Sequence, residues 1–128
     1  MPRPVHFEIH CENAERAANF YRTLFGWTIT KWDGPWEYWL VGTGSGTPGI
    51  DGALVSRRGP APAADAPVSA YVITMDVASC DDSVAAITAN GGTIALPKMP
   101  IPGIGWLAYG KDTEGNIFGV MQGDKSVK

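Results

Sequence analysis

The sequence predicts an α+β fold built from two β-α-β-β-β modules. Its 128 residues are 45% hydrophobic and 18% charged, a composition typical of one globular domain. The order strand, helix and three strands is expected twice along the chain. The segment Gly26-Trp27-Thr28-Ile29 recurs 65 residues later as Gly91-Gly92-Thr93-Ile94. These observations together predict an internal duplication.

The first module begins with a strand from Val5 to Cys11. Alternate side chains of a strand point to opposite faces, so one face is apolar and the other carries His6, Glu8 and His10. An amphipathic helix follows, with Asn13 as its N-cap and Gly26 as its stop.

Three further strands complete the first module. The aromatic segments Trp27–Lys31 and Trp36–Val41 form a hairpin through the turn Asp33-Gly34-Pro35, and Gly52–Arg57 is a short strand. The segment Arg58–Pro67, RGPAPAADAP, is the expected linker.

The second module repeats this order. A strand is expected at Ser69–Val77. A helix is expected to follow, beginning with the capping signal Ser79 to Asp82 and ending at Gly91-Gly92. The remaining strands are Thr93–Leu96, Trp106–Lys111 and Asn116–Gln122, the last two joined by the turn Asp112-Thr113-Glu114-Gly115. The proline-rich segment Lys98–Gly105 is read as a connection in preference to a lid.

The whole chain, residues 1–128, is expected to form one domain. Module one spans about 4–58, the linker 58–67 and module two about 68–123, followed by a short C-terminal tail. Each four-stranded sheet has one covering helix, so its other face is bare. We expect the bare faces of the two sheets to face each other and to enclose a cleft for a ligand.

Charge and composition restrict the partners. Ten Lys and Arg against 13 Asp and Glu give a net charge of −3, which disfavours nucleic-acid binding. No apolar run approaches the roughly 18 residues of a membrane span, and the N-terminus MPRPVHFE does not resemble a signal peptide. Cys11 and Cys80 are far apart and lack CxxC spacing, so a reduced, cytoplasmic protein is expected.

One glycine-rich loop matches a cofactor motif. Gly44–Gly49 fits the pattern G-x-G-x-x-G of dinucleotide-binding proteins. That motif must open a helix whose N-terminus faces the phosphates. Here another short strand follows, so a flexible loop is the preferred interpretation.

The spacing in the chain that most suggests a catalytic or metal-binding site is that of His6, Glu8 and His10 in the segment His6-Phe7-Glu8-Ile9-His10. On a strand, His6 and Glu8 are roughly 6.5 to 7 Å apart, and His6 and His10 about 13 Å. The two histidines therefore cannot share a metal, and the chain has no others. His6 with Glu8 could form an acid/base pair or supply two metal ligands, fewer than a metal site needs.

Four aromatic residues lie within eight positions, namely Trp32, Trp36, Tyr38 and Trp39. On the strand that follows the turn, one row is Trp36/Tyr38/Leu40 and the other is Glu37/Trp39/Val41. One row should face the cleft, where it would suit a flat or apolar ligand. The sequence leaves open which row that is.

Two segments carry a family resemblance. VHFEIHCENAERAANFYRTLFGW and KMPIPGIGWLAYGKDTEGNIFGVMQ, together with the repeated module pattern, resemble the vicinal oxygen chelate superfamily, which includes glyoxalase I, bleomycin-resistance proteins and extradiol dioxygenases. The resemblance runs from Val5 to Gln122 and is closest to the small bacterial glyoxalase/bleomycin-resistance branch. It implies metal ligands on the first and last strands of each module.

Carried over residue by residue, this ligand set is incomplete. His6 matches the first-strand ligand of module one, but the matching position of module two falls on Ala70 and the final-strand Glu falls on Gly119. The remaining ligand falls near Gly52 or Ala53, beside Asp51. The resemblance thus implies at most two of four ligands, and we expect neither a metal nor another cofactor.

The expected function is metal-free binding of a small molecule. The catalytic candidates are His6 and Glu8. The candidate ligand-binding residues are His6, Glu8, Trp36, Tyr38, Trp39, Trp106 and Tyr109. Two alternatives stay open: a glyoxalase-like lyase or isomerase, or dioxygenase-related enzyme, that uses His6 and Glu8, and a non-catalytic subunit of an assembly. A homodimer also stays open.

Overall fold

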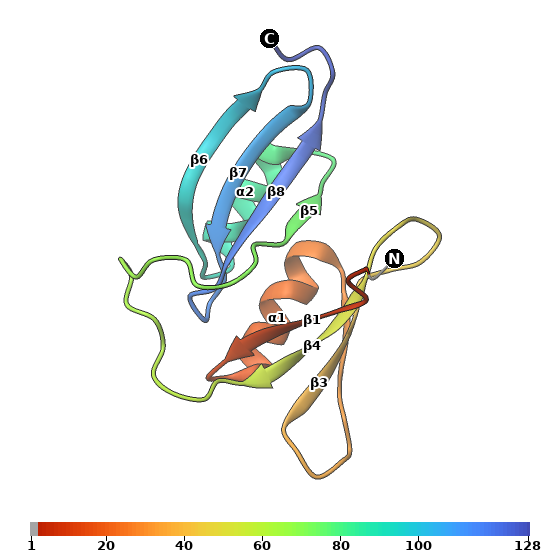
Figure 1. Ribbon diagram of the computed structural model, residues 1–128, viewed down its shortest axis with the longest axis vertical. Coiled ribbons are helices and arrows are strands. Elements are labelled where there is room, and N and C mark those ends of the chain that lie inside the picture. Colours follow the sequence, from red (N-terminus) through yellow and green to blue (C-terminus); the bar gives the residue numbers. More distant parts are fainter. Residues whose placement is uncertain (1–2) are drawn as a thin grey trace. The chain divides into compact units, whose positions relative to one another are not determined.

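The computed structural model describes residues 3–128 (Figure 1). The chain divides between Ala61 and Pro62 into two compact units, here called the N-terminal and the C-terminal unit. Each unit contains one four-stranded sheet and one helix. The predicted pair of β-α-β-β-β modules is therefore confirmed.

The sheet of the N-terminal unit has the strand order β1-β4-β3-β2. Strand β1 runs parallel to β4, whereas β3 is antiparallel to both β4 and β2. The elements are β1 (His6–Cys11), α1 (Ala14–Phe25), β2 (Thr28–Lys31), β3 (Tyr38–Gly42) and β4 (Asp51–Ser56).

Helix α1 covers one face of this sheet with an aromatic core. The rings of Tyr21 on α1 and Trp27 stack with their centroids 5.0 Å apart, and Phe7 of β1 lies 5.9 Å from Trp27. The caps explain the length of the helix: the Asn13 side chain accepts a hydrogen bond from the Arg16 amide, and Gly26 ends the helix with a φ of 69°. Both caps match the sequence prediction.

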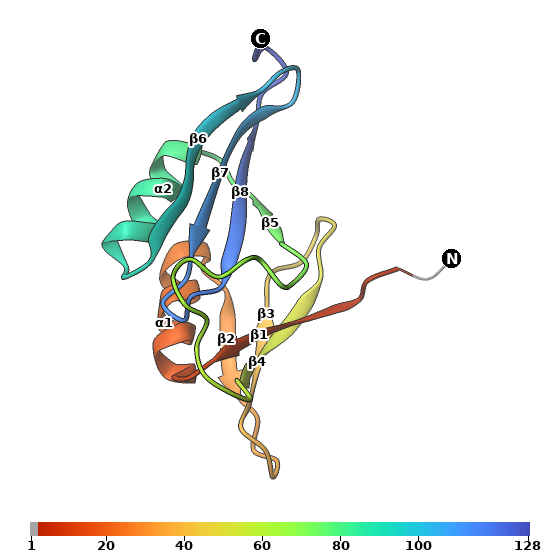
Figure 2. The same cartoon turned by 60° about the vertical axis from the view of Figure 1, so that its left-hand side comes forward.

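The C-terminal unit repeats this architecture with the order β5-β8-β7-β6. In Figure 2, α2 lies along one face of its sheet. The Gln122 side chain accepts a hydrogen bond from the Cys80 amide at the start of α2, and Ser79 caps the helix as expected. The elements are β5 (Thr74–Asp76), α2 (Cys80–Ala89), β6 (Thr93–Ile101), β7 (Gly105–Lys111) and β8 (Ile117–Gly123).

Two strands of the C-terminal unit differ in length from the sequence prediction. The strand predicted for Ser69–Val77 is only Thr74–Asp76, because Thr74 pairs with Gly119 and the residues before Val72 would lie opposite the turn that precedes β8. The predicted connection Lys98–Gly105 is largely strand, since β6 continues to Ile101 with two register shifts. Its prolines are tolerated because β6 is an edge strand.

The turn between β7 and β8 is fixed by one buried carboxylate. Asp112 accepts hydrogen bonds from the backbone amides of Glu114 and Asn116 at 2.8 and 2.9 Å. These bonds satisfy backbone donors that no strand partner reaches. Within residues 3–128, no helix has the length and apolar character needed to cross a membrane.

Candidate functional site

The side of the N-terminal sheet that α1 does not cover carries most of the predicted site residues. Phe7, Ile9 and Cys11 point toward α1, so their neighbours on β1 point the other way. The strand registers extend this face across β4 and β3. We call it the N-terminal open face; its central residues are His6, Glu8, His10, Tyr38, Leu40, Asp51, Ala53 and Val55.

A hydrogen bond crosses three strands of this face. The hydroxyl of Tyr38 on β3 lies 3.1 Å from Nε2 of His6 on β1. The register places Ala53 of β4 between them, and this small side chain is fully buried. A larger residue at Ala53 would obstruct the path of the tyrosine, so the local sequence permits the pair to form.

Asp51 lies directly opposite His6 in the parallel register. Its Oδ1 accepts a hydrogen bond of 2.8 Å from the Thr43 amide and one of 3.3 Å from the Thr43 hydroxyl. The carboxylate thereby anchors the start of the glycine-rich β3–β4 loop. It also places a negative charge at the His6 end of the face. In the sequence, Asp51 stood out only as a neighbour of a ligand position that the family resemblance implies.

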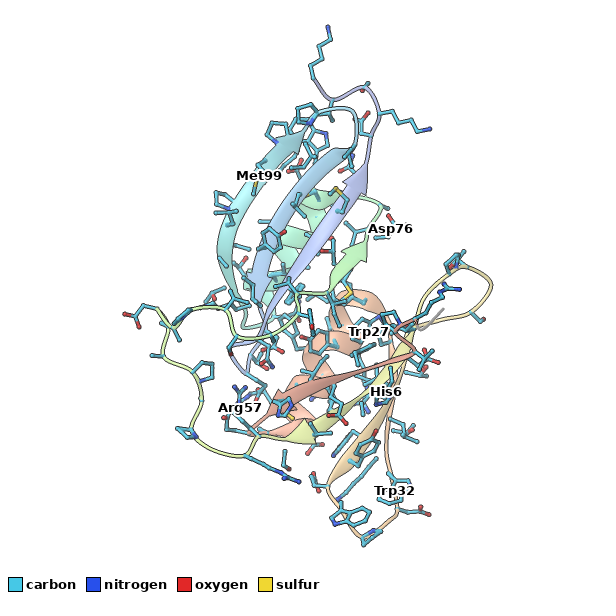
Figure 3. The ribbon with its side chains drawn as sticks, viewed as in Figure 1. His6, Trp27, Trp32, Arg57, Asp76 and Met99 are labelled. Carbon is cyan, nitrogen blue, oxygen red and sulfur yellow. The ribbon has the colours of Figure 1, made fainter. Side chains whose placement is uncertain are left out.

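An aromatic group adjoins this hydrogen bond. The ring centroids of Trp32 and Trp36 are 6.0 Å apart in a stacked arrangement, and the Trp32 ring meets Tyr38 edge to face, also at 6.0 Å. Figure 3 labels His6 on β1 and Trp32 at the end of the β2–β3 hairpin. We call Trp32, Trp36 and Tyr38 the aromatic ledge.

Trp32 was not among the predicted ligand-binding residues. Its backbone amide donates a 2.8 Å hydrogen bond to the Tyr38 carbonyl, which closes the β2–β3 loop and sets Trp32 opposite Tyr38. The signal in the sequence was the period of two along β2, since Thr28 and Thr30 face the same way as Trp32. This alternation shows that Trp32 lies on the same face as Tyr38 only once the pairing of β2 with β3 is known.

The other predicted residues lie on other faces of the two sheets, each within its own unit. Trp39 pairs with Leu54 on the α1 side of the sheet and donates to Glu37 through Nε1 at 3.0 Å. In the C-terminal unit, Trp106 lies on the α2 side, where Lys98 Nζ is 4.5 Å from its ring centroid. Tyr109 lies on the opposite side of that sheet, beside Gly119.

Lys98 also lies 3.0 Å from the carboxylate of Asp81, at the start of α2. These contacts assign Trp106 to the packing of α2 and β6. Nearby, burial raises the pKa of the Cys80 thiol above its ordinary value; Lys98 opposes that rise and Asp81 adds to it. The Cys80 side chain is fully buried, and both its burial and the raised pKa are typical of a packing residue.

Comparisons with known proteins agree with this architecture. Residues 3–44 match the family described as bleomycin resistance protein-like N-terminal. No curated protein matches the sequence. A glyoxalase/bleomycin resistance protein/dioxygenase family enzyme from Burkholderia phytofirmans PsJN superposes with a TM-score of 0.69 at 14% identity, over 93% of this chain and 97% of that one. The chain has the vicinal oxygen chelate fold. The predicted resemblance is thus confirmed.

Two more solved structures share the vicinal oxygen chelate fold with this chain. Hypothetical protein SA1046 from S. aureus is 18% identical, with a TM-score of 0.71 over 95% of this chain and 97% of that one. A mutant of the fosfomycin resistance protein FosX from Listeria monocytogenes is 14% identical, with a TM-score of 0.73 over 97% and 94%. That FosX mutant was solved with Mn(II) and 1S,2S-dihydroxypropylphosphonic acid.

The residues of this chain do not fit such a metal. Across residues 3–128, no three His, Cys, Asp or Glu side chains are grouped so that they could hold a metal ion. A Cβ at Gly119, the position aligned with the final-strand Glu, would lie 2.8 Å from the Thr74 hydroxyl. Counting back from the N-caps Asn13 and Ser79 aligns His6 with Val72 rather than with Ala70. Neither residue has a side chain that coordinates metals.

Proposed function

We propose that this chain binds a small molecule on the N-terminal open face and needs no metal to do so. The observation that carries this proposal is the hydrogen bond between His6 and Tyr38, on the side of the sheet that α1 leaves uncovered. Both residues stand on strands, so their positions are set by the backbone ladder and not by a loop. Binding groups held in this way are well oriented before a ligand arrives.

The chemistry of the face suits recognition of a polar group. Glu8 is exposed on the same side of β1 as His6, and Asp51 lies across the ladder from His6. Leu40 and Val55 supply apolar surface beside these groups. An apolar surface with a few convergent polar side chains is the usual composition of a small-molecule site.

Donor geometry favours binding without a metal. Catalytic zinc sites normally have three protein ligands and an open position. On the N-terminal open face, His6 Nε2 is hydrogen-bonded to Tyr38 and the Asp51 carboxylate is hydrogen-bonded to Thr43. The side chains present are therefore better suited to hydrogen-bond a ligand than to hold a metal ion.

Calorimetric titration with metal-free bleomycin in EDTA tests this proposal, with fosfomycin as a small phosphonate for comparison. Tyr38→Phe removes one hydrogen bond and should weaken bleomycin binding about 5- to 10-fold. His6→Ala should weaken it at least as much. Tyr71→Phe is the matched control, because Tyr71 is fully exposed in the segment before β5 and should leave affinity unchanged.

Metal content is measured on the same protein. Zinc, nickel, manganese and iron should each be far below one ion per chain after dialysis, because too few ligands are grouped among the described residues 3–128 to retain them. The proposal fails if neither bleomycin nor fosfomycin binds. It also fails if binding appears only after a metal is added, or if His6→Ala and Tyr38→Phe bind as the wild type does.

A further inference from the structure

We infer that the ligand carries a planar aromatic cation, which stacks on the aromatic ledge at the end of the β2–β3 hairpin. This inference rests on the proposed function and names the chemical class of its ligand. The first observation in support is the exposure of Trp36: 73% of its surface is exposed, although it is one of the largest apolar side chains in the chain. An exposed indole face offers a flat surface for another ring.

The ledge is continuous with the polar pair. The Trp36 ring stacks on Trp32 at 6.0 Å with 19° between the planes, Trp32 contacts the Tyr38 ring, and the Tyr38 hydroxyl reaches His6. A stacked ring would thus lie at one end of the site and a polar group of the same ligand near His6. The contacts form one unbroken series from the β2–β3 loop to β1.

The position of Trp32 depends on a glycine. A Cβ at Gly34 would overlap the Trp32 ring, so the indole occupies the space that the side chain of any other residue would fill. The hydrogen bond from the Trp32 amide to Tyr38 fixes the backbone beneath the ring. Trp32 is therefore held in place before any ligand binds, which limits the entropy lost on binding.

The charges around the ledge select a cation. Asp33 precedes Trp36 in the loop, and Glu8 and Asp51 lie on the N-terminal open face, whereas Glu37 is directed to Trp39 on the α1 side of the sheet. Lys31 is the basic residue nearest in sequence, and its Nζ lies 3.7 Å from the Glu37 carboxylate. Described residues 32–38 contain no Lys or Arg. Tryptophan is also the aromatic side chain that attracts cations most strongly.

Three probes share one ring system and differ in charge, so they separate the effect of charge from that of shape. N-methylacridinium is a permanent cation. In mildly alkaline buffer, acridine is neutral and acridine-9-carboxylate is an anion. Each is titrated calorimetrically into the full chain. The cation should bind about tenfold more tightly than acridine, and the anion more weakly than both. The preference for the cation should decrease as salt is added.

Two variants locate the site. Trp36→Ala removes the stacking surface, and Gly34→Ala displaces Trp32 without removing an aromatic ring. Each should weaken N-methylacridinium binding about tenfold or more. Trp39→Phe is the matched control, because Trp39 lies on the α1 side of the sheet and its replacement should leave the affinity unchanged. Circular dichroism confirms that each variant is folded.

The outcomes distinguish this inference from the proposed function. Equal binding of the three probes, or cation binding that survives both Trp36→Ala and Gly34→Ala, overturns the inference. If bleomycin binding still depends on Tyr38 in that case, the proposed function stands. If bleomycin, fosfomycin and all three acridines fail to bind, both are overturned. A cation preference lost in both variants and kept in Trp39→Phe supports the inference.

Discussion

The N-terminal and C-terminal sheets share one topology but differ in the chemistry of the faces that their helices leave uncovered. The N-caps Asn13 and Ser79 and the strand registers define equivalent positions in the two units. The equivalent pairs on the uncovered faces are His6/Val72, Glu8/Thr74, His10/Asp76, Tyr38/Leu107, Leu40/Tyr109, Asp51/Ile117, Ala53/Gly119 and Val55/Met121.

Three of the five polar residues among the N-terminal members of these pairs have an apolar counterpart. His6, Asp51 and Tyr38 of the N-terminal unit correspond to an aliphatic residue in each case. The helix-covered sides are more alike, since Leu54 of β4 and Val120 of β8 are equivalent and both fully buried. Packing against a helix constrains one side of each module, whereas the other side is free to acquire different chemistry.

The largest expected effect tests this shared covered side. Leu54→Ala should destabilise the protein by about 2–5 kcal/mol, because it leaves a cavity beneath α1. Val55→Ala, one residue along on the N-terminal open face, is the control and should cost much less. Urea denaturation measures both variants. Equal costs would show that α1 does not define the packed side.

A smaller effect is expected at Gly119 on the uncovered face of the C-terminal sheet. Gly119→Glu should cost about 1–3 kcal/mol, because its Cβ would lie 2.8 Å from the Thr74 hydroxyl and 3.1 Å from the Tyr109 ring. Gly123→Glu is the matched control at the end of the same strand, where a Cβ has open space. It should change stability by no more than about 0.5 kcal/mol. Thermal melts compare the two.

If Gly119→Glu is as stable as Gly123→Glu, the space at Gly119 is not as restricted as the contacts indicate. Gly119→Glu should also fail to create a zinc site, since its neighbours in the two strand registers are Thr74 and Tyr109, which are not the usual zinc ligands. Stoichiometric zinc in the purified variant would contradict the contrast between the two faces.

The smallest expected effect concerns pH and the C-terminal unit. Hydrogen bonds from the hydroxyl and the amide of Ser126 lower the pKa of Asp124 below its ordinary value of 3.8. A lowered pKa means that this carboxylate stabilises the fold above pH 3.8 and that the contribution is lost as the pH falls through the folded-state value. The Asp124 side chain is exposed, so the contribution is small.

Asp124→Asn tests this sign. The wild type should have a slightly higher Tm than the variant at pH 7, and the difference should shrink as the pH falls below 3.8. Thermal melts at several pH values measure it. A difference that grew toward acid pH would show that protonated Asp124 is the stabilising form.

The sequence by itself determined the local elements. Asn13, Gly26 and Ser79 set helix ends through their own side chains or backbone conformation, and these signals act within a few residues. Alternation along β1 likewise placed His6 and Glu8 on one side of that strand. The module order was accessible for the same reason, because it follows from the succession of such elements, and the fold family was indicated by the resemblance of two segments together with that order.

Only the tertiary structure decided which distant residues meet. The alternation of β3 left two rows open, and the pairing of β3 with β4 selected Tyr38 over Trp39 as the partner of His6. The same dependence on partners shortened the strand at Thr74–Asp76 and brought Trp32 into the aromatic ledge. Strand register is set by contacts between residues far apart in the chain, so the sequence of one strand does not determine which residues of the neighbouring strand lie opposite it.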